Sequence, residues 1–450
     1  HGRCARHRPH RAELTAGMTA LRLVWFLALG LGLALVEQPY QALSALGFAL
    51  QQRFWALPGL VGGAAEHRGV GALLVFAGSF LTVWLAWGPL RRARGGGLPP
   101  LLALQQAPLA QQAALLDRLD LRTQLRRLPL MLFTHLGGLT VGIESPSASL
   151  GAALLLAIRR RWPAAQPLAG LSLPLVAAIG GGAGLGAAFR SPLLGTAYAL
   201  EELSRQKGLD LVLPTLLLGG SGTLLLQAVL PQAAPGGQAF AAVPIQWWGL
   251  ALVITLIAAM AGALFVKVLI PLSGWLAAGL RRQRWWGAAL IALALLLIAL
   301  GSGGLSLNDG GLSLDSALAG GSGGVPATVL WRTLSSWLSI AAGAPGGLMH
   351  DTMTLGSLLS ERVIAWTGAW HGGLVTAERG QLAAVGATAL FAAACGTPVF
   401  CALFVFTLQG DPQILPLLLL CSAVAVACAA PLRGTGWNEH GTEGLCRALT

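Results

Sequence analysis

Long stretches without a charged residue constrain this chain more than any other feature of its sequence. A helix of about 20 apolar residues spans the ~30 Å hydrocarbon core of a bilayer. Shorter apolar stretches, interrupted by Gly, Pro or one Arg, bring the expected number of crossings to about ten, some by broken or tilted helices. Only 10% of the residues are charged, so we predict an all-α polytopic membrane protein. The clearest stretches are residues 69–90, 247–266, 285–308 and 413–432.

The glycine content indicates which kind of membrane protein this is. The chain has 61 Gly and 24 Pro, which is many for a bundle of long helices. Irregular backbone is tolerated at membrane depth only where it is buried in protein or lines a cavity. We therefore expect helices that break inside the membrane, which favours a channel or transporter over a simple anchor.

The net charge of +12 comes almost entirely from arginines. They fall in short runs between apolar stretches, as cytoplasmic loops do under the positive-inside rule. We therefore predict a multi-pass protein of the cell membrane (the inner membrane in a Gram-negative cell), with the lipid bilayer and not nucleic acid as its partner. A positive field also favours anionic permeants. The runs are Arg91, Arg92 and Arg94, then Arg126 and Arg127, then residues 159–161, then Arg281, Arg282 and Arg284.

An internal repeat points to the site. Gly142 precedes Gly151 with the same spacing as Gly347 precedes Gly356, and a proline follows each block at nearly the same distance. Repeats in which Gly- and Pro-broken segments correspond are the best sequence pointer to a transporter site. Half-helices there aim their N-terminal ends, with unpaired N–H groups and about half a positive charge, at the substrate. We predict a dehydrated anion held by helix N-termini.

The repeat also predicts how the chain is divided. We expect two inverted membrane halves joined by a linker. The basic start is either a cytoplasmic tail or a translated stretch upstream of the true start. The parts are residues 1–17 (basic tail), 18–230 (first half), 231–246 (linker), 247–432 (second half) and 433–450 (short C-terminal tail).

Four motifs, in order, resemble those of the CLC family of voltage-gated chloride channels and chloride/proton exchangers. Residues 95–99 resemble the family's GSGIP, residues 142–146 its GREGP and residues 343–351 its GAPGGIFAP. Residues 187–202 resemble AAFNAPLAGxxFxxEE. The resemblance is to a divergent, prokaryotic-type member and extends from about Leu73 to about Leu408. It implies a CLC-like inverted-repeat fold and a homodimer with one pore per subunit. It also implies that the protein is not an enzyme and needs no cofactor.

Two carboxylates carry the mechanism that the resemblance implies. Glu144 is an ionisable residue flanked by apolar helix, which marks a functional site by default in a membrane. In the family this glutamate is a gate that competes with the permeant anion and swings away when protonated. Glu202 corresponds to the inner proton-transfer glutamate of the exchangers. The alternative is that Glu201 and Glu202 simply end an apolar helix beside Arg205 and Lys207.

Backbone N–H groups at helix N-termini are the expected anion ligands. The family's coordinating serine is Gly96 here, and its central tyrosine has no visible counterpart, since Tyr40 and Tyr198 are the only tyrosines. The other departures are Ile143 and Ser145 in the second motif and Met349, His350 and Asp351 in the third. Ser145 or His350 is a candidate substitute donor, against the alternative of a core or cavity-lining position. The anion-binding positions that the resemblance implies are Gly96, Gly97, Leu98, Gly347, Leu348 and Met349.

The function implied is chloride/proton exchange gated by Glu144. The first alternative is a passive voltage-gated chloride channel, and the second is a fluoride/proton exchanger, motivated by Gly96. A remote alternative is an intramembrane serine protease, because Ser221 and Ser322 each lie in a GxSG motif, with His350 or His371 as a base. That short motif occurs twice in Gly-rich sequence, so it is weak. The scattered histidines have no metal-ligand spacing, and we expect neither a metal nor a cofactor.

Overall fold

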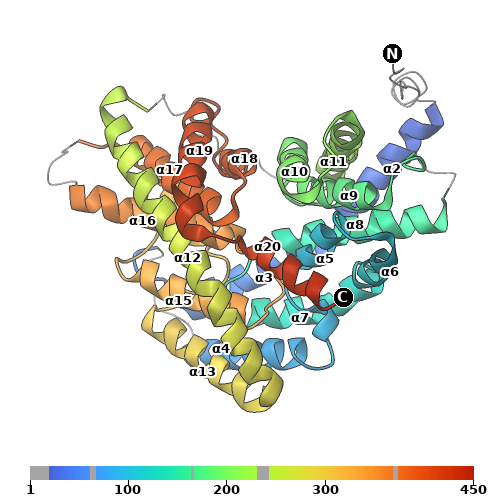
Figure 1. The fold of residues 1–450 in the computed structure, drawn as a ribbon. Coiled ribbons are helices and arrows are strands. Elements are labelled where there is room, and N and C mark those ends of the chain that lie inside the picture. The colour runs from blue at the N-terminus through green and yellow to red at the C-terminus, as the bar shows by residue number, and fades with distance from the viewer. Residues whose placement is uncertain (1–19, 61–66, 164–166, 231–242, 368–372, 450) are drawn as a thin grey trace.

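The computed structural model describes residues 20–60, 67–163, 167–230, 243–367 and 373–449, which Figure 1 draws as a ribbon. Within these residues the chain is helical, and one isolated antiparallel bridge is its only β-type pairing. The expected basic tail 1–17 and most of the linker 231–246 lie outside the described residues. The all-α prediction is confirmed.

Six segments among the described residues are long and apolar enough to cross a membrane. α12 extends well past the predicted stretch 247–266, through Lys267 and Pro271. This is possible because Lys267 is exposed and its long apolar stem can carry the charge to the membrane surface. The six are Leu23–Phe54 (α2, Ala20–Val36, and α3, Gln38–Phe54), α4 (Arg68–Ala86), α11 (Leu209–Val229), Ile245–Arg282 (η3, Ile245–Trp247, and α12, Trp248–Arg282), α13 (Arg284–Gly301) and α19 (Leu415–Arg433).

Two apolar stretches of the sequence are each broken into two helices. Residues 173–198 form α9 (Leu173–Ala188) and α10 (Pro192–Tyr198), and residues 376–409 form α17 (Thr376–Cys395) and α18 (Pro398–Gln409). The second helix of each pair starts with a proline, which lacks an N–H and suits a first helical position. Gly396 ends α17 with a φ of 86°, the left-handed conformation that closes many helices. The prediction of broken helices is confirmed.

The remaining helices are mostly short. The turn η2 has π-helical geometry, which in other proteins is frequent at functional sites. The remaining elements are η1 (Arg91–Ala93), α5 (Leu98–Leu104), α6 (Leu109–Arg118), α7 (Leu121–Leu136), α8 (Glu144–Arg161), η2 (Ala199–Leu203), α14 (Gly311–Leu318), α15 (Thr328–Ala341), α16 (Met349–Thr367) and α20 (Trp437–Arg447).

Glycine contacts give the two repeat blocks the same packing. α8 packs against α9, and α16 packs against α17. A Cβ atom added at Gly151 would lie 2.3 Å from the carbonyl oxygen of Gly180, and one added at Gly356 would lie 2.2 Å from that of Gly386. Small residues of this kind let helix backbones approach closely where no hydrophobic effect drives helices together in lipid. Each repeat block is therefore held against its partner helix by the same glycine-to-backbone contact.

Helices distant in sequence interlock around this centre. α2 packs against α11, α4 against α13, and the C-terminal α20 against α5. In Figure 1, α8 to α11 lie on one side and α12 and α15 to α19 on the other, with α20 reaching across to α5. The expected short tail 433–450 therefore contains a helix, which brings the end of the chain to the first motif.

A buried ion pair joins α15 to the first turn of α16. Arg332 and Asp351 are both inaccessible to solvent, with Nη2 of Arg332 2.9 Å from Oδ1 of Asp351. The guanidinium also donates to the carbonyl oxygens of Leu305 and Asn308, each at 2.8 Å. Asp351 stands where the third motif of the family has proline, so this departure from the motif serves packing.

We expect Arg332→Met to be strongly destabilising. Removing one partner of a buried pair leaves an uncompensated charge, which costs about 3–5 kcal/mol. The double variant Arg332→Met/Asp351→Leu should recover part of the loss, because it removes both charges. Thermal unfolding of purified protein in detergent measures the effect. Arg362→Met breaks the more exposed pair with Glu361 and should cost at most about 1 kcal/mol. Equal losses from Arg332→Met and Arg362→Met would contradict this account.

Candidate functional site

The N-termini of α8 and α16 meet at the centre of the fold. The N–H of Gly142 donates to the carbonyl of Gly347 at 3.0 Å, and the N–H of Gly347 donates back at 2.9 Å. Each glycine opens its repeat block, and each precedes a helix N-terminus by two residues. The first N–H groups of a helix have no partner within it, and they carry partial positive charge. The pairing therefore brings two anion-attracting helix ends together, as the repeat predicts.

The side chain of Glu144, the first residue of α8, lies at the N-terminus of α16. Its side chain is inaccessible to solvent, and its Oε1 accepts a hydrogen bond of 3.1 Å from the N–H of His350, the second residue of α16. The same oxygen contacts Nδ1 of the His350 ring. The other oxygen, Oε2, has no hydrogen-bond partner among the described residues. The carboxylate is therefore itself an anion held at a helix N-terminus, where a permeant anion would compete with it.

The first motif presents a third helix N-terminus, that of α5. Gly97 caps α5 with a φ of 83°, a conformation that glycine adopts without strain. A Cβ atom there would lie 2.5 Å from both Oγ of Ser149 and Nη2 of Arg127. Arg127 is 1% exposed and donates to the Ala93 carbonyl at 3.2 Å. A buried positive charge thus lies directly behind the first motif.

The prediction that the run of Arg126 and Arg127 lies in a cytoplasmic loop is wrong. Both Arg126 and Arg127 belong to α7, and only Arg126 is exposed. Adjacent residues of a helix point in directions about 100° apart, so a charge pair in the sequence separates into one residue facing outward and one facing the site.

Ser145 fills the space that a side chain at Gly96 would need. A Cβ atom added at Gly96 would lie 2.4 Å from Cβ of Ser145 and 2.9 Å from the carbonyl oxygen of Gly346. The two departures from the family motifs are therefore linked, since a serine in the second motif excludes one in the first. The Ser145 hydroxyl stands close to where the hydroxyl of the first motif would be.

One cavity connects these N-termini with the protein surface. Its volume is about 560 Å³, and we call it the vestibule. It is lined by all six positions predicted to bind the anion (Gly96, Gly97, Leu98, Gly347, Leu348 and Met349) and by Ser145. A cavity lined by charges of one sign concentrates the opposite ion. Its arginines are Arg91, Arg92, Arg94, Arg118, Arg127 and Arg281.

The structure separates the two neighbouring carboxylates of η2. Glu201 accepts the backbone N–H groups of Val399 at 3.0 Å and Phe400 at 2.6 Å, and so binds the N-terminus of α18. Glu202 instead accepts a hydrogen bond of 2.8 Å from Nδ2 of Asn438, which lines the vestibule. The helix-end alternative therefore suits Glu201, whereas Glu202 lies beside the vestibule. Its partner Asn438, in α20, was not singled out from the sequence.

Tyr198 is the last residue of α10, directly before η2. Its side chain is 1% exposed, and its hydroxyl has no hydrogen-bond partner among the described residues. Both Glu144 and Glu202 are within electrostatic range of it. A ring contact of 4.4 Å between centroids joins it to Phe400. A buried phenol that leaves its hydroxyl unpaired is costly unless something else binds it.

The structure does not assemble a protease site. The hydroxyl of Ser221 donates to the carbonyl oxygens of Phe26 and Leu218, both at 3.2 Å, and that of Ser322 donates to the Gly324 carbonyl at 2.8 Å. The candidate base His371 lies outside the described residues. Neither GxSG motif therefore pairs its serine with a base in the part of the chain that the structure describes.

Comparison with known proteins gives consistent matches. The sequence model of one family, voltage gated chloride channel, matches residues 75–430. The chain is 26% identical over 378 residues to the H(+)/Cl(-) exchange transporter ClcA of Cronobacter sakazakii (strain ATCC BAA-894), covering 78% of this chain and 73% of that protein.

Solved structures share the fold. A slow cyanobacterial Cl⁻/H⁺ antiporter matches with a TM-score of 0.71 at 21% identity, covering 96% of this chain and 99% of that one. A CLC-type fluoride/proton antiporter matches with a TM-score of 0.67 at 21% identity, covering 92% and 96%. A eukaryotic CLC transporter matches with a TM-score of 0.69 at 17% identity, covering 94% and 74%. The predicted inverted-repeat fold is confirmed.

Proposed function

Because this chain belongs to the voltage-gated chloride channel family, we propose that it exchanges chloride for protons across a membrane. The observation that carries the proposal is the position of Glu144. A buried carboxylate accepts the N–H of His350 at the N-terminus of α16, and that position suits an inorganic anion equally well. The Glu144 carboxylate competes with chloride while it is ionised and no longer competes once it is protonated. Its protonation can therefore couple the movement of chloride to that of protons.

The geometry supports a simple cycle. An anion enters the arginine-lined vestibule and is held there by helix N-termini and the Ser145 hydroxyl. While Glu144 is ionised, its carboxylate blocks the path of the anion past the N-terminus of α16. When a proton neutralises it, it leaves the N-terminus of α16, and the anion takes its place. We propose Glu202, which is hydrogen-bonded to Asn438 of the vestibule, as the inner proton donor. The proposed backbone ligands are those of Gly96, Gly97, Leu98, Gly347, Leu348 and Met349.

Fluoride/proton exchange is a second candidate. The observation that favours it is Gly96, which removes the hydroxyl that the family's chloride site has in the first motif. The Ser145 hydroxyl argues for chloride, since it stands close to the missing one. A passive chloride channel would need Glu144 but gives no role to Glu202 beside the vestibule.

We propose further that the protein is a homodimer in the lipid bilayer of the cell membrane, with one pore per subunit. The arginines of the vestibule support its placement on the cytoplasmic side, by the positive-inside rule. Two inverted membrane halves, residues 18–230 and 247–432, are supported by the matching glycine contacts of the two repeat blocks.

Purified protein in liposomes tests the proposal. Under a chloride gradient, with the voltage clamped by valinomycin, we expect chloride efflux and proton movement together, the chloride gradient driving protons against their own. Simultaneous recording of anion efflux and external pH measures both. Chloride flux without protons would replace exchange with a passive channel. Flux with fluoride alone would establish the second candidate.

A further inference from the structure

The pair of Glu144 and His350 lies beyond the inner end of the vestibule. Ser145, Gly347 and Met349 line that cavity, but Glu144 and His350 do not. Protons that reach Glu144 from the opposite, outer side therefore need a route that does not use the vestibule. The proposed exchange requires such a route, because each cycle must load or release a proton on the outer side.

His350 is held in one orientation against Glu144. Its Nδ1 contacts Oε1 of Glu144. Phe189 stacks on the imidazole ring, with 5.7 Å between centroids and 24° between planes. Phe404 meets the same ring edge-on at 5.4 Å and 87°. The histidine side chain keeps 13% of its surface exposed, whereas Glu144 keeps none. The ring is thus the group through which the buried carboxylate meets a more accessible region.

Two acidic residues lie in the segment around the start of α14. Asp309 precedes α14 and is 6% exposed, and Asp315 lies on α14 and is exposed. Both carboxylates are within electrostatic range of the His350 ring. The hydroxyl of Thr354 bridges the two segments, contacting the carbonyl oxygens of His350 at 2.9 Å and Asp309 at 3.3 Å. The Thr354 contact thus joins the backbone of the Asp309 segment to that of His350, and Asp315 is the solvent-exposed acid of the same segment.

The other charged groups nearby are occupied elsewhere. Arg332 and Asp351 pair with each other. Arg190 follows Phe189 and donates to the side chain of Gln227 and the carbonyl of Leu230. Among the described residues, Glu144, Asp309 and Asp315 are the charged groups that act electrostatically on His350. Oδ1 of Asp309 also accepts the N–H of Gly311 at 3.0 Å.

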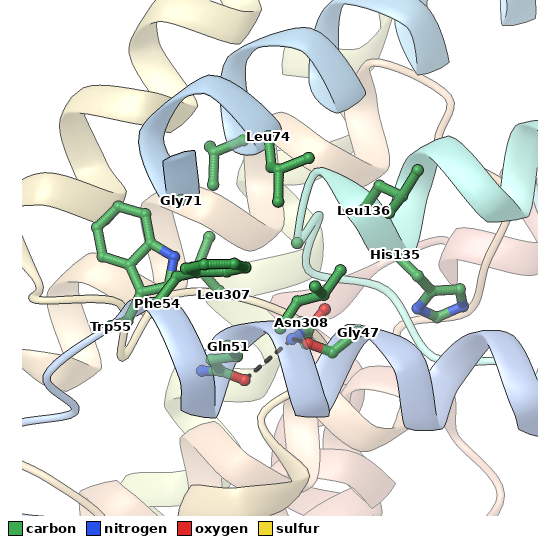
Figure 2. A pocket seen from close by; sticks show the side chains of 13 residues that line it. Gly47, Gln51, Phe54, Trp55, Gly71, Leu74, His135, Leu136, Leu307 and Asn308 are labelled. Atoms are coloured by element: carbon green, nitrogen blue, oxygen red, sulfur yellow. Dashed lines mark hydrogen bonds between the residues drawn. The ribbon is translucent and has the colours of Figure 1, made fainter. Parts of the chain in front are cut away.

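A small polar pocket fixes the segment that carries Asp309. Figure 2 shows Asn308 joined to Gln51 by a hydrogen bond, with His135 alongside. Nδ2 of Asn308 donates at 3.0 Å both to Oε1 of Gln51 and to the Gly47 carbonyl. The pocket has a volume of about 10 Å³, the space of about one water molecule. Its hydrogen bonds hold the backbone next to Asp309 against α3.

We propose that His350 relays protons between the outer solution and Glu144, with Asp309 and Asp315 delivering them to the ring. Nε2 of a neutral imidazole takes a proton, and Nδ1 releases its proton to Oε1 of Glu144. The carboxyl group becomes neutral, and the ring returns to neutrality with its proton on Nε2. The first tautomer is restored when Nε2 releases its proton to the Asp309 carboxylate and Nδ1 takes up one proton from solvent. This role rests on the proposed function, since only an exchanger needs it.

The test uses two variants of the reconstituted protein. His350→Gln has an amide in place of the imidazole, and an amide neither takes up nor releases a proton at neutral pH. Asp309→Asn is a milder variant. A positioned acid–base group contributes about 10²–10⁴-fold to proton transfer. We expect His350→Gln to lower coupled exchange at least about tenfold, and Asp309→Asn to lower it less. Imidazole added outside should restore exchange in a His350→Gly variant, a rescue that a merely structural role would not give. The matched control is Glu378→Gln, which changes a half-buried carboxylate at the start of α17 that accepts the N–H of Val375 at 3.1 Å. This variant should exchange as the unaltered protein does.

The anion path is checked separately in a Glu144→Gln background, in which chloride passes without protons. Asp309→Asn added there should leave the chloride leak unchanged, which also shows that this variant folds. Unchanged exchange in His350→Gln, or loss of the leak in the double variant, would overturn the relay. The proposed function itself would fail if the unaltered protein moved no protons and Glu144→Gln gave no chloride leak. That result differs from loss of the relay alone, in which the unaltered protein still exchanges both ions.

Discussion

Glu144→Gln is expected to abolish proton transport and to leave a passive chloride leak. Glutamine has nearly the shape of glutamate but cannot bind or release a proton at neutral pH. Its neutral amide no longer competes as an anion for the N-terminus of α16. Proton flux in liposomes should fall at least about 100-fold, the contribution expected of an acid–base group. Chloride efflux should then run down its own gradient without changing the external pH.

The control is Glu361→Gln. Glu361 is also a carboxylate of α16, but it accepts the N–H of Gly323 at 2.8 Å and pairs with Arg362 at 3.2 Å, away from the site. Its loss should leave coupled exchange intact. Proton transport that survived in Glu144→Gln would refute the gate and, with it, the coupling scheme.

Glu202→Gln is expected to have an effect of similar size on protons but not on chloride. Its carboxylate lies beside the vestibule, held by Asn438, and in the proposed cycle it supplies protons to Glu144. Removing it should lower proton flux about 100-fold. Chloride efflux should continue, because Glu202 is not among the residues that line the vestibule. The same liposome recording separates the two fluxes.

Glu201→Gln is the matched control for this variant. The two residues are adjacent, carry the same group and lie in the same π-helical turn, but Glu201 binds the N-terminus of α18. An amide oxygen can still accept one of these N–H groups, so we expect at most a loss of about 1 kcal/mol in stability and unchanged coupling. If both variants kept full coupling, Glu202 would have no role in proton transfer and would only end an apolar helix, which is the alternative given in the sequence analysis.

The site was predictable from the sequence to the extent that its ligands are backbone groups. The spacing of the repeat blocks already placed Glu144 and residues 347–349 at corresponding helix starts. The antiparallel pairing of Gly142 with Gly347 realises that correspondence. A repeat of this kind is readable because each glycine and proline has a local effect on the backbone.

Side-chain partners were harder to predict. Arg127 was expected in a cytoplasmic loop, and Asp309 and Asn438 were not singled out. Asp309 follows an apolar stretch, and an acid at that position is a functional-site signal that could have been used. No comparable signal exists for Asn438, because its partner Glu202 is 236 residues away. The linked departures at Gly96 and Ser145 also became visible only as one steric contact.

By itself, the sequence determined that the chain is a helical membrane protein, that its helices break, and that an anion is the natural substrate of its helix ends. These follow from hydropathy and backbone chemistry, which act within about one helical turn. Only the tertiary structure decided which carboxylate binds α18 and which lies beside the vestibule, and that His350 contacts Glu144. Such pairings join residues that are some 200 positions apart, and the packing of the two repeats against each other sets them.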